Sequence, residues 1–393
     1  MLTAQLDSAP ALLRRVEAAG LRGRGGAGFP LARKLRAVRD AGLAAGLAPV
    51  TVANGEEGEP GSVKDKYLLR QRPHEVLDGL TLAARMVGAG HAYVYVSDPV
   101  SAAAITAAVR SRTDPLGIEV IEVEHAYVAG EESAVVRRID GGPALPTAKP
   151  PRPFERGVGG APTLVSNVET LARLAALARG ERTDRLLLTV SGAGLLPRLY
   201  EVPEGMALGE LVRVHLGDTR PRGLMLRGLM LGGLAGGIHT PAILPAPLSF
   251  DSLAAAGAAL GCGAIHLIGP DQCPVAVVRD ALSYLAEQSA RQCGVCVTGT
   301  SRLAATMTKA AQGVATAADL DALERWAVML PGRGACGLLD AAARLAGSLT
   351  VSFPGALAAH MASPCAGPCA GCTQARGSIA VPVVPRTAEK VPT

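Results

Sequence analysis

A glycine-rich segment near the N-terminus constrains this chain more than any other feature. It runs from Gly23 to Pro30 as G-R-G-G-A-G-F-P, with four glycines in six residues. Because glycine has no Cβ, backbone N–H groups in such a loop can approach a phosphate or a flat ring closely. Leu31, Leu35 and Val38 share one helical face, so a helix is predicted directly after the loop. A helix N-terminus carries a partial positive charge, so an anionic ligand is predicted here, with a purely structural glycine turn as the alternative.

The first half of the chain alternates helical runs with short β-branched segments. Strands are predicted over residues 50–53, 92–97 and 118–123, with a helix over 75–87 between the first two. This alternation predicts an α/β domain with a Rossmann-like, mostly parallel sheet and helices on its faces. Open sheets of this kind bind ligands just past the strand ends, where several polar motifs lie. Asn167 is predicted to cap the helix that follows it.

From about residue 186 the pattern changes. Residues 187–191 and 198–202 predict two strands of a hairpin-like pair, and a helix is predicted over 208–216. Residues 280–359 are helical by periodicity, which predicts a compact helical bundle. We therefore expect an α/β domain over 1–185, a small β domain over 186–250, a helical domain over 251–362 and a cysteine-containing tail over 363–393.

Charge and hydropathy exclude two classes of partner. The net charge of +5 is scattered, and no block of Lys and Arg is interleaved with aromatics, so no nucleic-acid partner is expected. Arg14, Arg15 and Glu17 interrupt any N-terminal signal pattern. The most apolar stretch, residues 253–269, is marginal in length for a membrane span, so no direct membrane insertion is expected. We expect a cytoplasmic chain and leave peripheral attachment to a membrane complex open.

The eight cysteines all lie after residue 260. Close spacing, as C-x2-C at Cys293 and Cys296 and as C-x3-C-x2-C over residues 365–372, favours metal ligation over a disulfide scaffold. Cys262 and Cys273 stand apart in apolar surroundings, which is typical of plain buried thiols.

Three further segments accompany the glycine loop. Residues 54–66 read N-G-E-E-G-E-P-G-S-V-K-D-K, residues 130–133 read G-E-E-S, and residues 149–170 read K-P-P-R-P-F-E-R-G-V-G-G-A-P-T-L-V-S-N-V-E-T. In this order the four segments resemble the NADH-binding flavoprotein subunit of respiratory complex I, and its counterparts in NAD-linked hydrogenases and formate dehydrogenases. The resemblance covers roughly residues 10–360.

The resemblance implies an FMN-binding α/β domain, a small β-grasp domain and a C-terminal helical domain with an iron–sulfur cluster. Residues 200–212, Y-E-V-P-E-G-M-A-L-G-E-L-V, carry the β-grasp similarity. A solvated acidic turn is the alternative for the paired glutamates. The positions that the resemblance assigns to cofactor binding are Gly23, Arg24, Gly25, Gly26, Gly28, Phe29, Lys34, Asn54, Glu56, Glu57, Glu59, Gly130, Glu131, Glu132, Lys149, Asn167 and Thr170.

The nicotinamide side departs from the family, which holds the adenine of NADH between aromatic rings. Phe29 matches one ring, but Ala37 and Arg152 stand at the other two positions. Stacking on an aromatic contributes roughly 1–3 kcal/mol per base, so weaker NADH binding is expected. Arg152 could lie flat on the adenine or pair with a phosphate, and a preference for NADPH stays open.

The iron–sulfur site is the second departure. The family supplies four thiolates to a [4Fe–4S] cluster, as C-x2-C-x2-C and one distant Cys. Cys293, Cys296 and Cys336 match three positions, whereas Gly299 stands at the remaining one and offers no donor. A zinc site or no metal are the alternatives. The missing ligand could come from the tail, as Cys365, Cys369 or Cys372, from a non-cysteine residue, or from nothing.

Two functions follow as hypotheses. In the first, FMN takes a hydride from NADH or NADPH, and single electrons leave through the C-terminal cluster to a ferredoxin-like or thioredoxin-fold [2Fe–2S] protein. The flavin carries the chemistry, so no side chain is assigned as catalytic. In the second, the chain is an FMN-binding assembly or relay subunit that has lost NADH oxidation.

Overall fold

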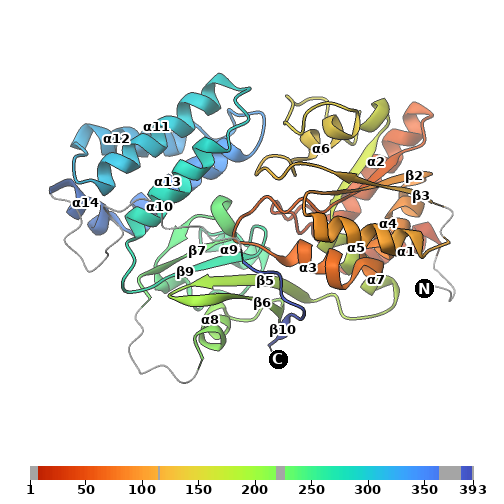
Figure 1. Cartoon of the computed structure of the whole chain (residues 1–393), viewed down its shortest axis with the longest axis horizontal. Coiled ribbons are helices and arrows are strands. Elements are labelled where there is room, and N and C mark those ends of the chain that lie inside the picture. The colour runs from red at the N-terminus through yellow and green to blue at the C-terminus, as the bar shows by residue number, and fades with distance from the viewer. Residues whose placement is uncertain (1–7, 114–115, 218–225, 363–381, 392–393) are drawn as a thin grey trace. The chain divides into compact units, whose positions relative to one another are not determined.

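A computed structural model describes residues 8–113, 116–217, 226–362 and 382–391 (Figure 1). These residues divide into two compact units. None of the described helices is both long and apolar enough to cross a membrane. The first unit holds the described parts of Met1–Gly58, Val63–Arg185 and Val384–Thr387, and the second unit holds those of Glu59–Ser62, Leu186–Val383 and Ala388–Thr393.

A four-stranded, all-parallel sheet forms the centre of the first unit, in the order β3-β2-β1-β4. The register aligns Asn54 with Asn167, so the last residues of two neighbouring strands bring two amides to one edge. The predicted mostly parallel sheet is thus confirmed. Its strands are β1 (Val50–Asn54), β2 (His91–Val96), β3 (Gly117–Glu122) and β4 (Thr163–Asn167).

Helices cover both faces of this sheet. They are α1 (Ala9–Ala18), α2 (Leu31–Ala45), α3 (Lys64–Gln71), α4 (Pro73–Val87), α5 (Pro99–Arg110), α6 (Glu132–Ile139), the 3-10 turn η1 (Val158–Gly160) and α7 (Val168–Ala178). α6 packs Val135 with Val52, Tyr95 and Val165 in one apolar cluster, because alternate strand residues point to its side of the sheet. α4 and α5 lie on the opposite side (Figure 1).

A six-stranded mixed sheet forms part of the second unit, in the order β10-β6-β5-β9-β7-β8. β7 pairs antiparallel with β8 and β9, whereas β9 runs parallel to β5 and β10 parallel to β6. Its strands are β5 (Arg185–Gly192), β6 (Leu195–Pro203), β7 (Gly228–Leu231), β8 (Ile238–His239), β9 (Ala264–Ile268) and β10 (Glu389–Lys390). Its helices are α8 (Leu208–Leu216), η2 (Gly233–Ala235), η3 (Pro241–Ile243), α9 (Phe250–Ala255), α10 (Pro274–Glu287), α11 (Gly294–Ala311), α12 (Ala317–Met329), α13 (Leu338–Ser352) and α14 (Pro354–Ala362).

The second unit differs from the sequence-based division in two places. The predicted strand pair and helix are present as β5, β6 and α8. However, the sheet also takes β9 from the part predicted to be helical and β10 from the predicted tail. Backbone pairing across large sequence separations places both strands, and a strand as short as β10 leaves no periodic pattern to read. The division into three domains and a tail stays a prediction.

Candidate functional site

The glycine loop closes on itself before α2 begins. The N–H of Gly23 donates to the carbonyl oxygen of Phe29 at 2.9 Å. Gly26 has a φ of 116° and Gly28 a φ of 62°, conformations that residues with a Cβ rarely adopt. A Cβ at Gly26 would meet nothing within 4 Å, so the backbone there borders open space. Among the described residues no side chain caps α2 and its first turn holds no acidic residue, although the N–H of Leu31 donates to the carbonyl oxygen of Leu21 at 2.8 Å.

The carboxyl ends of β1 and β4 bring two asparagines to this part of the unit. Asn54 donates from Nδ2 to the carbonyl oxygen of Gly130 at 2.8 Å. Asn167 caps α7 by accepting the N–H of Glu169 at 3.0 Å, as predicted. A Cβ on Gly25 would lie 3.4 Å from the Cβ of Asn167, so the loop lies against the end of β4.

Four buried charged residues, Arg24, Lys64, Asp65 and Glu169, form what we call the buried charge network. Arg24 Nε donates to Glu169 Oε1 at 3.0 Å, and Lys64 Nζ lies 2.6 Å from Asp65 Oδ1 and 3.2 Å from Glu169 Oε2. The backbone N–H of Arg24 donates to Thr170 Oγ1 at 2.8 Å. Although burial disfavours its charge, Asp65 and Glu169 raise the pKa of the Lys64 ammonium. The network therefore joins the glycine loop to the first turns of α3 and α7.

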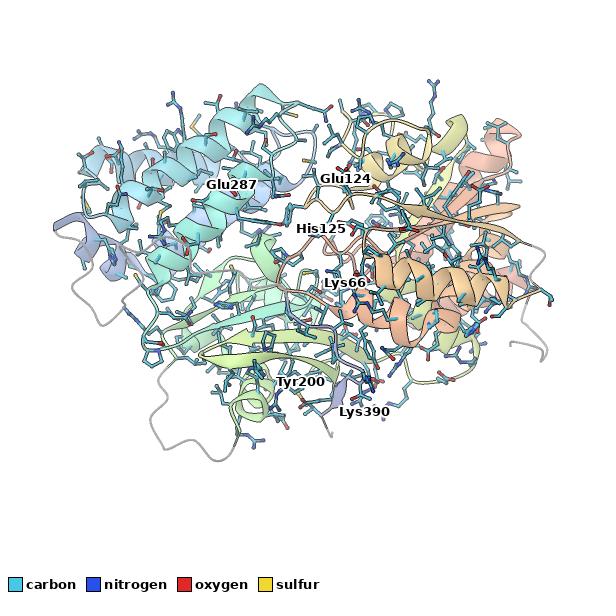
Figure 2. The ribbon with its side chains drawn as sticks, in the orientation of Figure 1. Lys66, Glu124, His125, Tyr200, Glu287 and Lys390 are labelled. Atoms are coloured by element: carbon cyan, nitrogen blue, oxygen red, sulfur yellow. The ribbon has the colours of Figure 1, made fainter. Side chains whose placement is uncertain are left out.

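The adjacent carboxylates Glu56 and Glu57 already have partners within the protein. Glu57 caps α3, because its two oxygens accept the N–H groups of Asp65 at 3.1 Å and Lys66 at 3.0 Å. Glu56 Oε1 lies 3.0 Å from Nδ1 of His125. Figure 2 labels His125 and Lys66. These contacts fix the loop after β1. Their predicted role in binding sugar hydroxyls stays a prediction.

Five charged side chains, which we call the ionic cluster, gather at the start of α6. Glu131 caps the helix and pairs with Lys149. Glu132 lies 3.5 Å from Lys34, 3.6 Å from Lys149 and 3.8 Å from Arg152. Burial lowers the pKa of the Lys34 ammonium, against the opposing effect of Glu132. With three cations and two carboxylates, the cluster has a net charge of +1, which suits an anionic ligand.

Two of the remaining residues assigned to nucleotide binding, Glu59 and Phe29, lie outside both the buried charge network and the ionic cluster. Glu59 belongs to the second unit, where its Oε2 accepts the N–H of Leu234 at 3.0 Å. Phe29 is 48% exposed, and the guanidinium of Arg33 lies 5.5 Å from its ring centroid. The Arg152 side chain is 57% exposed. Phe29 thus offers an exposed ring face, and the Arg152 guanidinium is accessible.

A cavity of about 550 Å³ lies between α6 and the segment over residues 142–160. Arg137 of α6 and Asp140 just after that helix line it, and Thr147 and Arg156 line it from the segment. A volume of this size could hold a nucleotide-sized molecule. The residues predicted to bind the cofactor are not among those that line it.

The predicted cysteine ligands lie at the ends of α11 and α13. Cys293 precedes α11, and Cys296 in its first turn is buried, with its Sγ 3.7 Å from Ser289 Oγ. A Cβ on Gly299 would lie 2.9 Å from Leu339 Cδ1 and 3.2 Å from Leu330 Cδ1, so leucine side chains lie beside the position that the resemblance assigns to the third thiolate. The predicted ligands Cys365 and Cys369, with Cys372, lie outside the described residues.

Sequence reasoning did not single out Lys64, Asp65 or Glu169, although all three lie inside the quoted segments. A signal is present in the sequence, since Lys64 and Asp65 stand at the start of a helix, separated by one residue from the apolar pair Tyr67 and Leu68. Nothing local to the sequence shows that these charges meet Glu169 across the fold, so their pairing required the structure.

The fold and the site together define a class of protein. The Nuo51 FMN-binding domain matches residues 16–176, and the NADH-ubiquinone oxidoreductase-F iron-sulfur binding region matches residues 276–360. The first match covers the parallel sheet, the glycine loop and the ionic cluster, and the second covers most of α10–α14. The protein is therefore an NAD(P)H-oxidising FMN flavoprotein with an iron–sulfur region. These matches support FMN, NADH and a [4Fe–4S] cluster.

The chain belongs to the family of the NADH-quinone oxidoreductase F subunits. It is 32% identical to the F 2 subunit of NADH-quinone oxidoreductase of Rhizobium meliloti (strain 1021), over 84% of each chain. It is 29% identical to the HndC subunit of the NADP-reducing hydrogenase of Solidesulfovibrio fructosivorans, over 82% of this chain and 70% of that protein. The structure of the air-oxidised NAD+-reducing [NiFe]-hydrogenase superimposes with a TM-score of 0.81 at 32% identity, and covers 91% of this chain and 64% of that one.

The residues of the first unit fit FMN, but the described cysteines do not complete a cluster site. Glycines with positive φ, a helix N-terminus without a capping side chain and an ionic cluster of net positive charge all suit a flavin phosphate. By contrast, within the described ranges no group of three or more His, Cys, Asp and Glu side chains is placed to hold a metal ion. The described residues therefore provide no complete four-thiolate site.

Proposed function

We propose that this chain binds FMN in its first unit, accepts a hydride from NADH or NADPH and delivers electrons to a partner protein. The observation that carries the proposal is the convergence of the glycine loop, Asn54 and Asn167 on one edge of a parallel sheet. Bound FMN supplies two-electron acceptance and one-electron release, which no side chain can provide. The relatives are named as subunits, which supports a partner protein as the acceptor. We propose a ferredoxin-like or thioredoxin-fold [2Fe–2S] protein for that role, as the resemblance implies.

The side chains of the first unit would bind and orient the cofactor and substrate. The backbone of the glycine loop would lie against the flavin, and Asn54 and Asn167 would hydrogen-bond to its polar atoms. Lys34 and Lys149 would balance phosphate charge, because both belong to the ionic cluster. Phe29 would stack on the adenine of the nicotinamide nucleotide.

A second function has one observation in its favour. Phe29 is the one residue with an aromatic ring among the three positions assigned to adenine stacking, since Ala37 and Arg152 take the others. An FMN-binding assembly or relay subunit without NADH oxidation would need no such stacking.

Anaerobic mixing of the FMN-loaded protein with NADH or NADPH separates these functions. The proposed oxidoreductase bleaches the visible flavin band with at least one of the two nucleotides. An assembly subunit retains FMN, and its band persists until dithionite is added. Protein that cannot be reconstituted with FMN at all would contradict both functions.

A further inference from the structure

The hydrogen bonds around Asn167 determine which way its side-chain amide points. Its Oδ1 accepts the N–H of Glu169 at 3.0 Å and lies 3.4 Å from Lys64 Nζ, and its Nδ2 donates to Asp65 Oδ2 at 2.6 Å. A backbone N–H and an ammonium can only donate, so the atom that they face is an oxygen. An ionised carboxylate can only accept, so the atom that faces Asp65 is the nitrogen.

Asp65 is ionised in this arrangement because both of its oxygens face donors. Oδ1 lies 2.6 Å from Lys64 Nζ and Oδ2 accepts from Asn167. Burial raises the pKa of Asp65 to about 7, and the charges of Glu57 and Glu169 add to that shift, whereas Lys64 opposes it. A proton on Oδ2 would point at the amide hydrogen of Asn167 and a proton on Oδ1 at the ammonium, so the geometry favours the carboxylate.

The amide cannot turn over without loss. Rotation by half a turn would set the NH2 group against two donors and the amide oxygen against the Asp65 carboxylate. The side chains of Lys64 and Asp65 are 1% and 6% exposed, so water could not compensate these contacts fully. Asn167 is itself partly exposed, and the second hydrogen of its Nδ2 has no partner among the described residues.

We propose that Asp65, held by Lys64, is a positioning residue that fixes Asn167 as a hydrogen-bond donor toward FMN. The proposal rests on the proposed function, since it requires FMN at this edge of the sheet. The donor would serve an acceptor atom of the cofactor, either a phosphate oxygen or a carbonyl or ring nitrogen of the flavin. Without Asp65, only the contacts of Glu169 N–H and Lys64 with the amide oxygen would oppose rotation of the amide, so its nitrogen would be held less firmly toward the cofactor.

Exchanging the two side chains tests the proposal, because the exchange reverses the hydrogen bond without changing the charge or the set of atoms. In the double variant Asp65→Asn/Asn167→Asp, the amide at 65 donates to the carboxylate at 167, which still accepts from Glu169 and Lys64. Position 167 then presents an acceptor to the cofactor instead of a donor. Each single variant leaves one mismatch, two facing donors in Asp65→Asn and two facing carboxylates in Asn167→Asp.

Two measurements on the full chain without FMN separate positioning from stability: the Tm, and the Kd for FMN from quenching of its fluorescence. We expect each single variant to lower the Tm and the double variant to recover most of that loss. The double variant should nevertheless bind FMN at least about tenfold more weakly than the wild type, because a donor has been replaced by an acceptor.

A double variant that binds FMN as tightly as the wild type would overturn the proposal. If the double variant does not fold, Asp65→Ser decides the question, since a serine is too short to hold both Lys64 and Asn167. Unchanged FMN affinity in folded Asp65→Ser contradicts the proposal, and a loss of about tenfold or more supports it. Wild-type protein that binds no FMN would overturn the proposed function as well, whereas wild-type binding with unchanged variants overturns only the positioning role.

Discussion

Several side chains assigned to this site hold the backbone in place. Glu57 and Glu131 both cap helices, and Asn167 both caps α7 and offers an N–H. The sequence segments identify these residues, because glycines and paired carboxylates stand out in a linear reading. They do not reveal the capping roles of Glu57 and Glu131, since a cap depends on where the backbone turns. The buried charge network lay beyond sequence reasoning because its charges come from three separate segments.

Replacing Gly26 with valine should abolish FMN binding. The position has a φ of 116° and borders open space, so a branched side chain would both strain the backbone and fill the cofactor's place. Gly88→Val is the matched control, because Gly88 also has a positive φ, 78°, and nothing within 4 Å of its absent Cβ. Both variants should lose stability by roughly 1–2 kcal/mol, but only Gly26→Val should lose FMN, as measured by fluorescence quenching. Equal FMN affinity in the two variants would refute the placement of the flavin.

Replacing Arg152 with phenylalanine should tighten NADH binding. The Arg152 side chain is 57% exposed and its Nη1 lies 3.8 Å from Glu132, so little structure depends on it. A ring at this position would add a stacking surface worth roughly 1–3 kcal/mol, which corresponds to a KM lowered by about 5-fold to 150-fold. Steady-state kinetics with NADH and NADPH measure the change. An unaltered or higher KM for both nucleotides would remove Arg152 from the adenine site.

At the scale of elements, local patterns predicted the helices and strands that carry their own periodicity. The helix after the glycine loop, the first three parallel strands and the cap of α7 appear as predicted. β9 and β10 were not assigned to a sheet, because their pairing partners are distant in sequence. The side-chain contact that joins α3 to α5 is likewise not predicted, because its two residues, Arg70 and Asp98, lie far apart in the sequence.

Asp98 makes the contact between α3 and α5, and its replacement should lower the free energy of unfolding in a pH-dependent way. It caps α5 and accepts hydrogen bonds from Arg70 of α3 at 2.7 and 3.0 Å. Burial opposes its charge, but the bonds from Arg70 and Ser101 prevail and lower its pKa below the ordinary 3.8. A lowered pKa means that its contribution is present at neutral pH and is lost as the pH falls through the folded-state value.

Asp98→Asn keeps a capping oxygen and removes the charge, so we expect a loss of roughly 1 kcal/mol at pH 7. The difference from the wild type should shrink as the pH is lowered below about 4, where the wild-type carboxyl also becomes protonated. Urea denaturation at a series of pH values measures the difference in the free energy of unfolding between the variant and the wild type. Asp184→Asn, which removes a solvent-exposed pair with Arg182, is the control and should have a smaller effect. A difference that stays constant with pH would show that the charge of Asp98 does not matter.

At the scale of the whole molecule, the number of cysteine ligands decides whether the helical region can hold an iron–sulfur cluster. The described residues contribute Cys293, Cys296 and Cys336, and leucines fill the place beside Gly299. If a tail cysteine completes the site, anaerobically purified protein should contain about four iron and four sulfide per chain. The double variant Cys365→Ser/Cys369→Ser should lose that content or convert the cluster, whereas Cys262→Ser should not. Full iron in the double variant would exclude these tail ligands, and stoichiometric zinc in the wild type would exclude the cluster.

Point substitutions are preferable to truncation because the C-terminal end of the chain is part of the second unit. β10 pairs with β6, and Val391 just after it is 2% exposed. Val391 belongs to the apolar cluster of this unit, together with Tyr200 and Val202 of β6. A chain cut before residue 363 would therefore lose the strand partner of β6 and uncover apolar surface, so its stability would fall together with its cysteine content.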